Sequence, residues 1–69
     1  MKIKVNGNEK KIELKNEKAL LSSTLKLLGY SPNTIVVEVN DLIINSTKWG
    51  DKMLKEGDRL EIVSIVGGG

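Results

Sequence analysis

The sequence predicts an α+β fold in which a mixed sheet of four to five strands packs against one main helix. Hydrophobicity alternates with period two at the start of the chain, β-branched residues dominate later runs, and a leucine-rich stretch between them has helical spacing. A helix placed between two groups of strands packs across one face of their sheet, which gives two layers. The 69 residues are enough for one small domain.

The chain begins with a predicted β-hairpin. Residues 2–6 alternate, with Ile3 and Val5 on one face, and Asn6-Gly7 suits a tight turn because both residues tolerate positive φ. The second strand is expected at 11–15, with Ile12 and Leu14 facing the same core.

The period then changes to that of a helix. The spacing predicts a helix over 17–28, with Asn16 as its N-cap and Glu17 complementing the helix dipole. Gly29 suits the position that ends a helix, and Pro32 prevents continuation. Six side chains form the broad apolar arc: Leu20, Leu21, Thr24, Leu25, Leu27 and Leu28.

The second half of the chain is predicted to add three strands. Residues 35–39 are nearly all β-branched and indicate a buried central strand, followed by a turn at Asn40-Asp41, a short strand over 42–44 and a helical turn near 47–50. Trp49, Met53 and Leu54 are expected to fold their segment onto the body, and Gly57-Asp58 turns the chain into a last strand over 59–66. The expected core is Ile3, Val5, Ile12, Leu14, Leu21, Leu25, Leu28, Ile35, Val37, Leu54, Leu60 and Ile62.

The composition excludes most catalytic and metal chemistry. Cysteine and histidine are absent, so the chain has no thiolate, no imidazole base and no disulfide, and we expect neither a catalytic residue nor a bound metal or cofactor. Glu56 and Asp58 are better explained as a turn feature than as an acid/base pair. Ser64 is expected to be buried or half-buried, with nothing nearby to activate it.

The charge pattern also excludes several partners. The net charge of +2 comes from interspersed lysines and acids, without the basic face that nucleic acid requires. No stretch has the length of a membrane span, and the charged N-terminus lacks the apolar run that is typical of a signal peptide. We therefore expect no nucleic acid or membrane partner, and a cytoplasmic location.

The last residues carry the main functional hypothesis. Gly67, Gly68 and Gly69 follow the final strand as a bare, flexible tail that spans roughly 10 Å when extended and fits a channel too narrow for side chains. If Leu60 and Ile62 face the core, Val63 and Ile65 face outward beside this tail and form a candidate partner-binding patch. The alternatives are a frayed terminus or tag remnant for the tail, and ordinary surface hydrophobics for the patch.

The chain resembles the β-grasp, ubiquitin-like sulfur carriers, and the thiamine-biosynthesis sulfur carrier protein (ThiS family) in particular. The resemblance covers essentially all 69 residues. It is carried by the opening Ile3-Lys4-Val5-Asn6-Gly7, by Val37-Glu38-Val39-Asn40, by Ser46-Thr47-Lys48-Trp49, and by Leu54-Lys55-Glu56-Gly57-Asp58-Arg59-Leu60-Glu61-Ile62-Val63 followed by Val66-Gly67-Gly68-Gly69. It implies a β-grasp domain over 1–66 and a flexible tail over 67–69, with a third glycine, Gly67, beyond the two that define the family motif.

The resemblance implies a carrier function and three kinds of partner. The carboxylate of Gly69 would be adenylated with ATP by a separate E1-like (ThiF-type) enzyme and converted to a thiocarboxylate. The sulfur would come from a donor such as a cysteine desulfurase or sulfurtransferase, and would pass to a ThiG-type thiazole synthase. ATP is then a substrate of the partner, and this chain is a carrier and not an enzyme.

Three alternatives share the fold. A small subunit of molybdopterin synthase would use the same tail with a different acceptor, although this chain is short for it. A ubiquitin-like modifier would join Gly69 to lysine in an isopeptide bond. A non-covalent binding module for RNA or protein would not need the tail.

Overall fold

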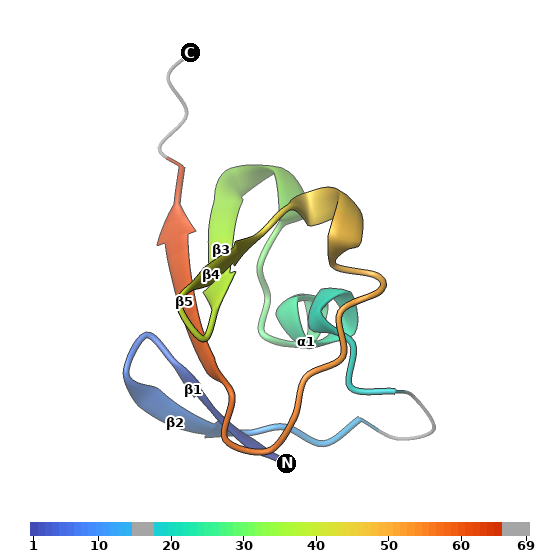
Figure 1. The fold of residues 1–69 in the computed structure, drawn as a ribbon, viewed down its shortest axis with the longest axis vertical. Coiled ribbons are helices and arrows are strands. Elements are labelled where there is room, and N and C mark those ends of the chain that lie inside the picture. Colours follow the sequence, from blue (N-terminus) through green and yellow to red (C-terminus); the bar gives the residue numbers. More distant parts are fainter. Residues whose placement is uncertain (15–17, 66–69) are drawn as a thin grey trace.

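The computed structural model describes residues 1–14 and 18–65, and in these residues five strands form one mixed sheet. The strand order is β2-β1-β5-β3-β4, and helix α1 lies against one face (Figure 1). The elements in chain order are β1 (Lys2–Val5), β2 (Asn8–Lys11), α1 (Leu21–Leu27), the 3-10 turn η1 (Pro32–Thr34), β3 (Ile35–Val39), β4 (Leu42–Ile44), the 3-10 turn η2 (Ser46–Lys48) and β5 (Arg59–Ser64).

The first hairpin forms around the predicted turn, but its second strand starts earlier than expected. Asn6 and Gly7 have φ of 51° and 83°, and Val5 pairs with Asn8 directly across this two-residue turn. The ladder therefore begins at Asn8, and the prediction of a strand over 11–15 is wrong because the turn geometry fixes the register. Ile12, just after β2, is buried as predicted.

The helix ends as predicted but begins later. Gly29 has φ of 90°, its N–H donates to the Lys26 carbonyl, and the Tyr30 N–H donates to the Leu25 carbonyl, each at 3.0 Å. This pair of hydrogen bonds is a Schellman motif.

The predicted start of this helix is wrong because Leu20 is extended and forms an isolated β-bridge with Met53. The Leu54 N–H also donates to the Ala19 carbonyl at 2.7 Å, so residues before Leu21 are bound to the 52–54 segment. Leu27 is exposed, contrary to its place in the predicted apolar arc. The predicted cap Asn16 and Glu17 lie outside the described residues.

Strand β3 alternates between buried positions and outward ones, of which Val36 is exposed and Glu38 half-buried, so it is not the continuously buried central strand that its composition predicted. Helix α1 covers only one face of the sheet, and Val36 on the other face remains exposed. The central position belongs to β5, which pairs parallel with β1 and antiparallel with β3. This arrangement places the last described strand at the middle of the sheet.

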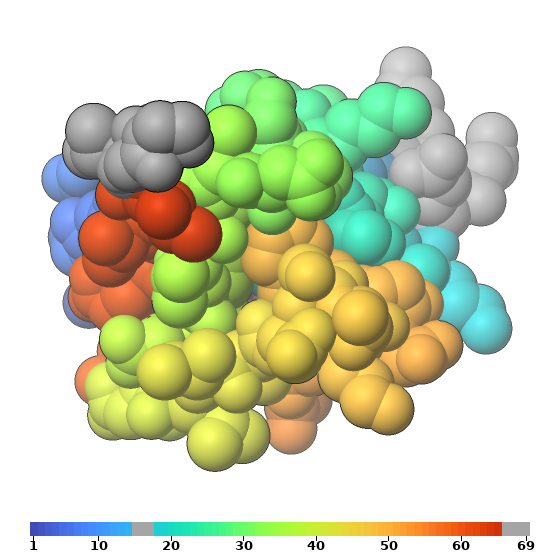
Figure 2. Space-filling model, turned by 90° about the horizontal axis from the view of Figure 1, so that it is seen from above, coloured from blue at the N-terminus to red at the C-terminus, as the bar shows by residue number. Residues whose placement is uncertain are grey.

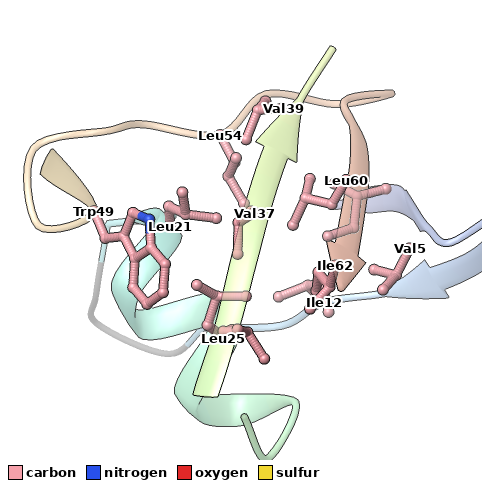
Figure 3. Packing of buried hydrophobic residues seen from close by; sticks show 12 residues of the cluster. Val5, Ile12, Leu21, Leu25, Val37, Val39, Trp49, Leu54, Leu60 and Ile62 are labelled. Carbon is pink, nitrogen blue, oxygen red and sulfur yellow. The ribbon is translucent and has the colours of Figure 1, made fainter. Parts of the chain in front are cut away.

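The core lies between the sheet and α1 (Figure 3). Leu21 and Leu25 of the helix point toward Val37 of β3, and Trp49 lies beside Leu21. The predicted core residues are buried except Leu14 and Leu28, which are partly buried and pack against it. The prediction omitted Val39 and did not place the Trp49 ring in the core, where its Nε1 donates to the Ile44 carbonyl at 2.9 Å. Met53 is 48% exposed, so of its segment Trp49 and Leu54 alone enter the core.

Candidate functional site: the end of strand β5

The sequence hypothesis places function beyond β5, and the structure shows how this strand is held. Its antiparallel partner β3 pairs with it from Val39↔Leu60 to Ile35↔Ser64. The parallel pairing with β1 is much shorter, because β1 contributes only Lys4↔Arg59 and Val5↔Leu60. Beyond Leu60, another group must occupy the β1 side of the strand.

That group is the side chain of Asn6. Its Oδ1 accepts a hydrogen bond from the Ile62 N–H at 2.7 Å, and its Nδ2 donates to the Ile62 carbonyl at 3.2 Å. The Asn6 backbone N–H donates to the Leu60 carbonyl at 2.8 Å. Asn6 thus continues the sheet hydrogen bonding by two residues after β1 has turned away. Its positive φ and amide side chain explain why asparagine fits this turn.

The beginning of β5 is held by a second set of polar contacts. The buried carboxylate of Asp58 accepts hydrogen bonds from the Lys55 N–H at 2.8 Å and from Nδ2 of Asn40 at 3.0 Å. Oδ1 of Asn40 accepts from the Arg59 N–H at 3.0 Å. Glu56 accepts from the Lys2 N–H at 3.0 Å. Both acids therefore organise the turn, which is the role that the sequence predicted for them.

The end of β5 exposes apolar side chains. Val63 and Ile65 are 60% and 51% exposed, as the strand alternation predicted. Val36, which pairs with Val63, is exposed beside them, and Ile43 of β4 is exposed on the other side of β3. We call Val36, Ile43, Val63 and Ile65 the β5-end patch.

A shallow groove accompanies this patch. It has a volume of about 350 Å³, and its lining includes Val36, Ile43 and Ile65 of the patch together with Pro32 and Trp49. Figure 2 views the molecule from this end and shows the red end of β5 beside β3 in lime and β4 in yellow-green. The patch and groove form an apolar surface at the point where β5 ends.

The predicted tail and part of the last strand lie outside the described residues. These are Gly67, Gly68, Gly69 and Val66, so the structure tests neither the tail nor the domain boundary at 66. Within the described residues β5 ends at Ser64, and the Ile65 N–H donates to the Thr34 carbonyl at 2.7 Å. Ile65, the last described residue, is therefore bound to the end of η1.

The described residues offer no catalytic constellation. Among them no group of three or more metal-binding side chains lies together. Ser64 is exposed, contrary to its predicted burial, and lies opposite Ile35 in the sheet. No helix in the described part of the chain has the length and apolar character that a membrane crossing requires.

Sequence reasoning found half of the patch and missed the rest. Val36 lies in a run whose composition predicts a buried strand. Ile43 lies in a run of three apolar residues that gives no alternation to identify the outward side chain. Asn6 was recognised as a turn residue only. The Asn6-Gly7 turn pattern gives no indication that the Asn6 side chain contacts strand β5, 56 residues later in the sequence.

The topology of the described residues defines a β-grasp protein: a mixed sheet with parallel β1 and β5 adjacent, two flanking hairpins and a helix on one face. Two solved structures share this fold. Thiamine biosynthesis protein ThiS from Geobacter metallireducens, in its crystal structure, has a TM-score of 0.81 and 24% identity, with 100% of both chains covered. An NMR solution structure of a thiamine biosynthesis protein from the same organism has a TM-score of 0.78 and 24% identity, covering 100% of this chain and 88% of that chain.

The sequence matches the ThiS family over residues 3–69, and the chain belongs to this family. This confirms the resemblance drawn from its segments.

Curated relatives extend the comparison. A thiazole synthase from Magnetococcus marinus is 33% identical over 69 residues, which are 100% of this chain and 20% of that protein. The chain thus spans only a fifth of the length of this relative. The uncharacterized protein ycf40 of Trieres chinensis is 37% identical over 49 residues, covering 71% of this chain and 67% of that protein.

Proposed function

We propose that this protein carries sulfur as a thiocarboxylate on Gly69 for thiazole formation in thiamine biosynthesis. The observation that carries the proposal is the match to the ThiS family over residues 3–69, which includes all three glycines. In this proposal the chain is a co-substrate of partner enzymes and performs no catalysis itself.

The chemistry needs an activated carboxyl group. A carboxylate is a poor electrophile, so an oxygen of the Gly69 carboxylate attacks the α-phosphate of ATP on the adenylating enzyme and releases pyrophosphate. Sulfide, the simplest sulfur donor, then attacks the carbonyl carbon, and AMP leaves with the original oxygen. The chain has no cysteine that could hold sulfur on a side chain. Glycine at the reacting position keeps the carbonyl free of steric hindrance.

The geometry of β5 supports this role. Asn6 and the Asn40–Asp58 contacts hold the strand on both sides, and β3 pairs with it as far as Ser64. A partner enzyme that binds a strand held in this way gains a rigid point of attachment close in sequence to Gly69, which favours productive placement of the reacting group.

The partners follow from the same chemistry. We propose a ThiF-type adenylating enzyme, a sulfur donor such as a cysteine desulfurase or sulfurtransferase, and a ThiG-type thiazole synthase. The thiazole synthase relative supports the last of these, because a segment similar to this whole chain lies within a protein of that name. The β5-end patch, which includes Val63 and Ile65, is the proposed contact surface.

Intact-mass spectrometry tests the proposal. Incubation with the adenylating enzyme, ATP and sulfide should replace one oxygen by one sulfur, and fragmentation should map the change to Gly69. A variant extended by one alanine after Gly69 should keep its fold and gain no sulfur. Sulfur on any other residue, lysine-linked conjugates without a thiocarboxylate, or full biological activity of the extended variant would refute the carrier function.

A substitution tests the patch. Val63→Asp should weaken binding to the adenylating enzyme by about tenfold, because it places a charge in a desolvated apolar contact. Its effect on stability should stay near 1 kcal/mol, since the side chain is 60% exposed. The matched control is Leu27→Asp on helix α1, where Leu27 is 55% exposed and away from the sheet's outer face, and binding should not change. Equal loss in both variants would argue against a specific patch.

A further inference from the structure

Two acidic side chains oppose each other on the outer face of the sheet. Glu38 of β3 pairs with Glu61 of β5 in the antiparallel register. Their neighbours Val37 and Ile62 are buried, so the alternation of the strands directs both glutamates away from helix α1. Directly opposed residues of an antiparallel pair have Cβ atoms about 5 Å apart.

This arrangement is unfavourable in the isolated protein. Like charges directly opposite each other destabilise a sheet. Within the described residues the ion pairs are Lys11–Glu13 and Arg59–Asp41, and neither contains Glu38 or Glu61. Arg59 lies on the same strand, but its guanidinium is 3.3 Å from the Asp41 carboxylate. The described part of the chain therefore provides no cation that bridges the two glutamates.

The acidic pair is continuous with the β5-end patch. On β3, Val36 precedes Glu38 by two positions, and on β5, Val63 follows Glu61 by two. Ile43 of β4 pairs with Glu38 on the other side. Apolar residues thus occupy positions next to the two glutamates on this face. An exposed apolar cluster beside two glutamates that form no ion pair in the described residues specifies the partner more narrowly than either feature alone.

We propose that Glu38 and Glu61 form the acidic half of the docking surface, and that the adenylating enzyme covers it with an apolar cluster beside one arginine or lysine. A cation placed between the carboxylates removes their repulsion and forms charge-assisted hydrogen bonds to both. A guanidinium suits this position best because its planar fork can contact two carboxylates at once. The inference rests on the proposed function, which supplies the identity of the partner.

The proposal predicts opposite effects on stability and binding. Glu38→Gln and Glu61→Gln keep the side-chain shape and remove one charge each, so each should raise the melting temperature by about 2 °C. Each should also weaken binding of the adenylating enzyme by about tenfold, with a smaller dependence on salt. If the two glutamates had only a structural role, their substitution would lower both the stability of the protein and its binding to the enzyme.

The experiment compares the full-length chain and its variants by thermal unfolding and by titration against the adenylating enzyme without ATP. Glu13→Gln is the matched control: its side chain is 71% exposed and follows β2, away from the patch, so its binding should equal the unsubstituted protein's. Unchanged binding of both Glu38→Gln and Glu61→Gln, within about twofold, would overturn the proposal. So would loss of self-association in these variants, which would identify a second copy of this chain as the occupant.

A kinetic measurement separates this inference from the carrier function. At saturating enzyme, Glu61→Gln should still acquire the C-terminal sulfur at the full rate, while its KM increases by about tenfold. If the unsubstituted protein acquires no sulfur, the carrier function fails, whereas the binding comparison still decides the role of the two glutamates. If all variants acquire sulfur with equal KM, the docking proposal fails and the carrier function stands.

Discussion

The contact between Asn6 and Ile62 predicts that one turn residue controls the stability of β5. Asn6→Gly removes both side-chain hydrogen bonds to the Ile62 backbone, at 2.7 Å and 3.2 Å. Glycine retains the positive φ of 51° and the backbone hydrogen bond to Leu60, so the turn itself is not strained. The substitution therefore isolates the contribution of the side chain.

The magnitude follows from these contacts. Each intramolecular hydrogen bond contributes about 1 kcal/mol net, so losing both costs about 2 kcal/mol. The added freedom of glycine in the unfolded chain contributes about 0.5 kcal/mol more. In a domain of this size 1 kcal/mol corresponds to about 4–8 °C, which predicts a decrease of roughly 10–20 °C in the melting temperature.

Two measurements check the prediction. Thermal unfolding followed by circular dichroism gives the change in stability, and amide hydrogen exchange reports on the Ile62 N–H directly. Asp41→Gly is the matched control, since Asp41 also has positive φ, at 71°, and its carboxylate contacts only the exposed Arg59 side chain. We expect its stability to change by about 0.5 kcal/mol or less. A similar small change in Asn6→Gly, with unaltered exchange at Ile62, would show that the side chain does not hold β5.

Three further substitutions test the core and the helix end. Thr24→Val should raise the free energy of unfolding by about 1 kcal/mol, because Thr24 is 0% exposed and the described residues give its Oγ1 no hydrogen-bond partner. Chemical unfolding measures this change, and a decrease in stability would mean that the hydroxyl group does form a hydrogen bond. Trp49→Phe should lower the free energy of unfolding by about 2–3 kcal/mol in the same assay, since it removes the hydrogen bond to the Ile44 carbonyl and leaves a cavity. An unchanged unfolding midpoint would contradict the burial of the Trp49 ring in the core. Gly29→Ala should cost about 1 kcal/mol through its φ of 90° alone, whereas Gly50→Ala, which also has open space around it, should be neutral.

Local chemistry was sufficient to predict the turns and much of the core. Asn6-Gly7 and Gly29 adopt the positive φ expected of them, because the conformational preference is a property of the residue itself. The alternation of β5 placed Leu60 and Ile62 inward and Val63 outward, as the structure shows. The α+β class followed from the change of period between the first hairpin and the helix.

The sequence pattern gave wrong predictions where contacts between distant segments determine the structure. The periodicity of the leucines gave no sign that Leu20 would pair with Met53, which prevents the helix from starting at residue 17. The composition of β3 likewise suggested burial on both faces, although a single helix covers only one. In each case a neighbour far away in the sequence determined the conformation or the exposure.

The candidate site divides in the same way. The sequence alone determined that the chain has no thiol or imidazole chemistry, and it indicated Val63, Ile65 and the terminal glycines as the functional region. Only the tertiary structure placed Val36 beside Val63, opposed Glu38 to Glu61, and brought Asn6 to Ile62. The physical reason is that alternation along a strand determines which face a side chain occupies, whereas the identity of its neighbours depends on strand order and register, which long-range packing sets.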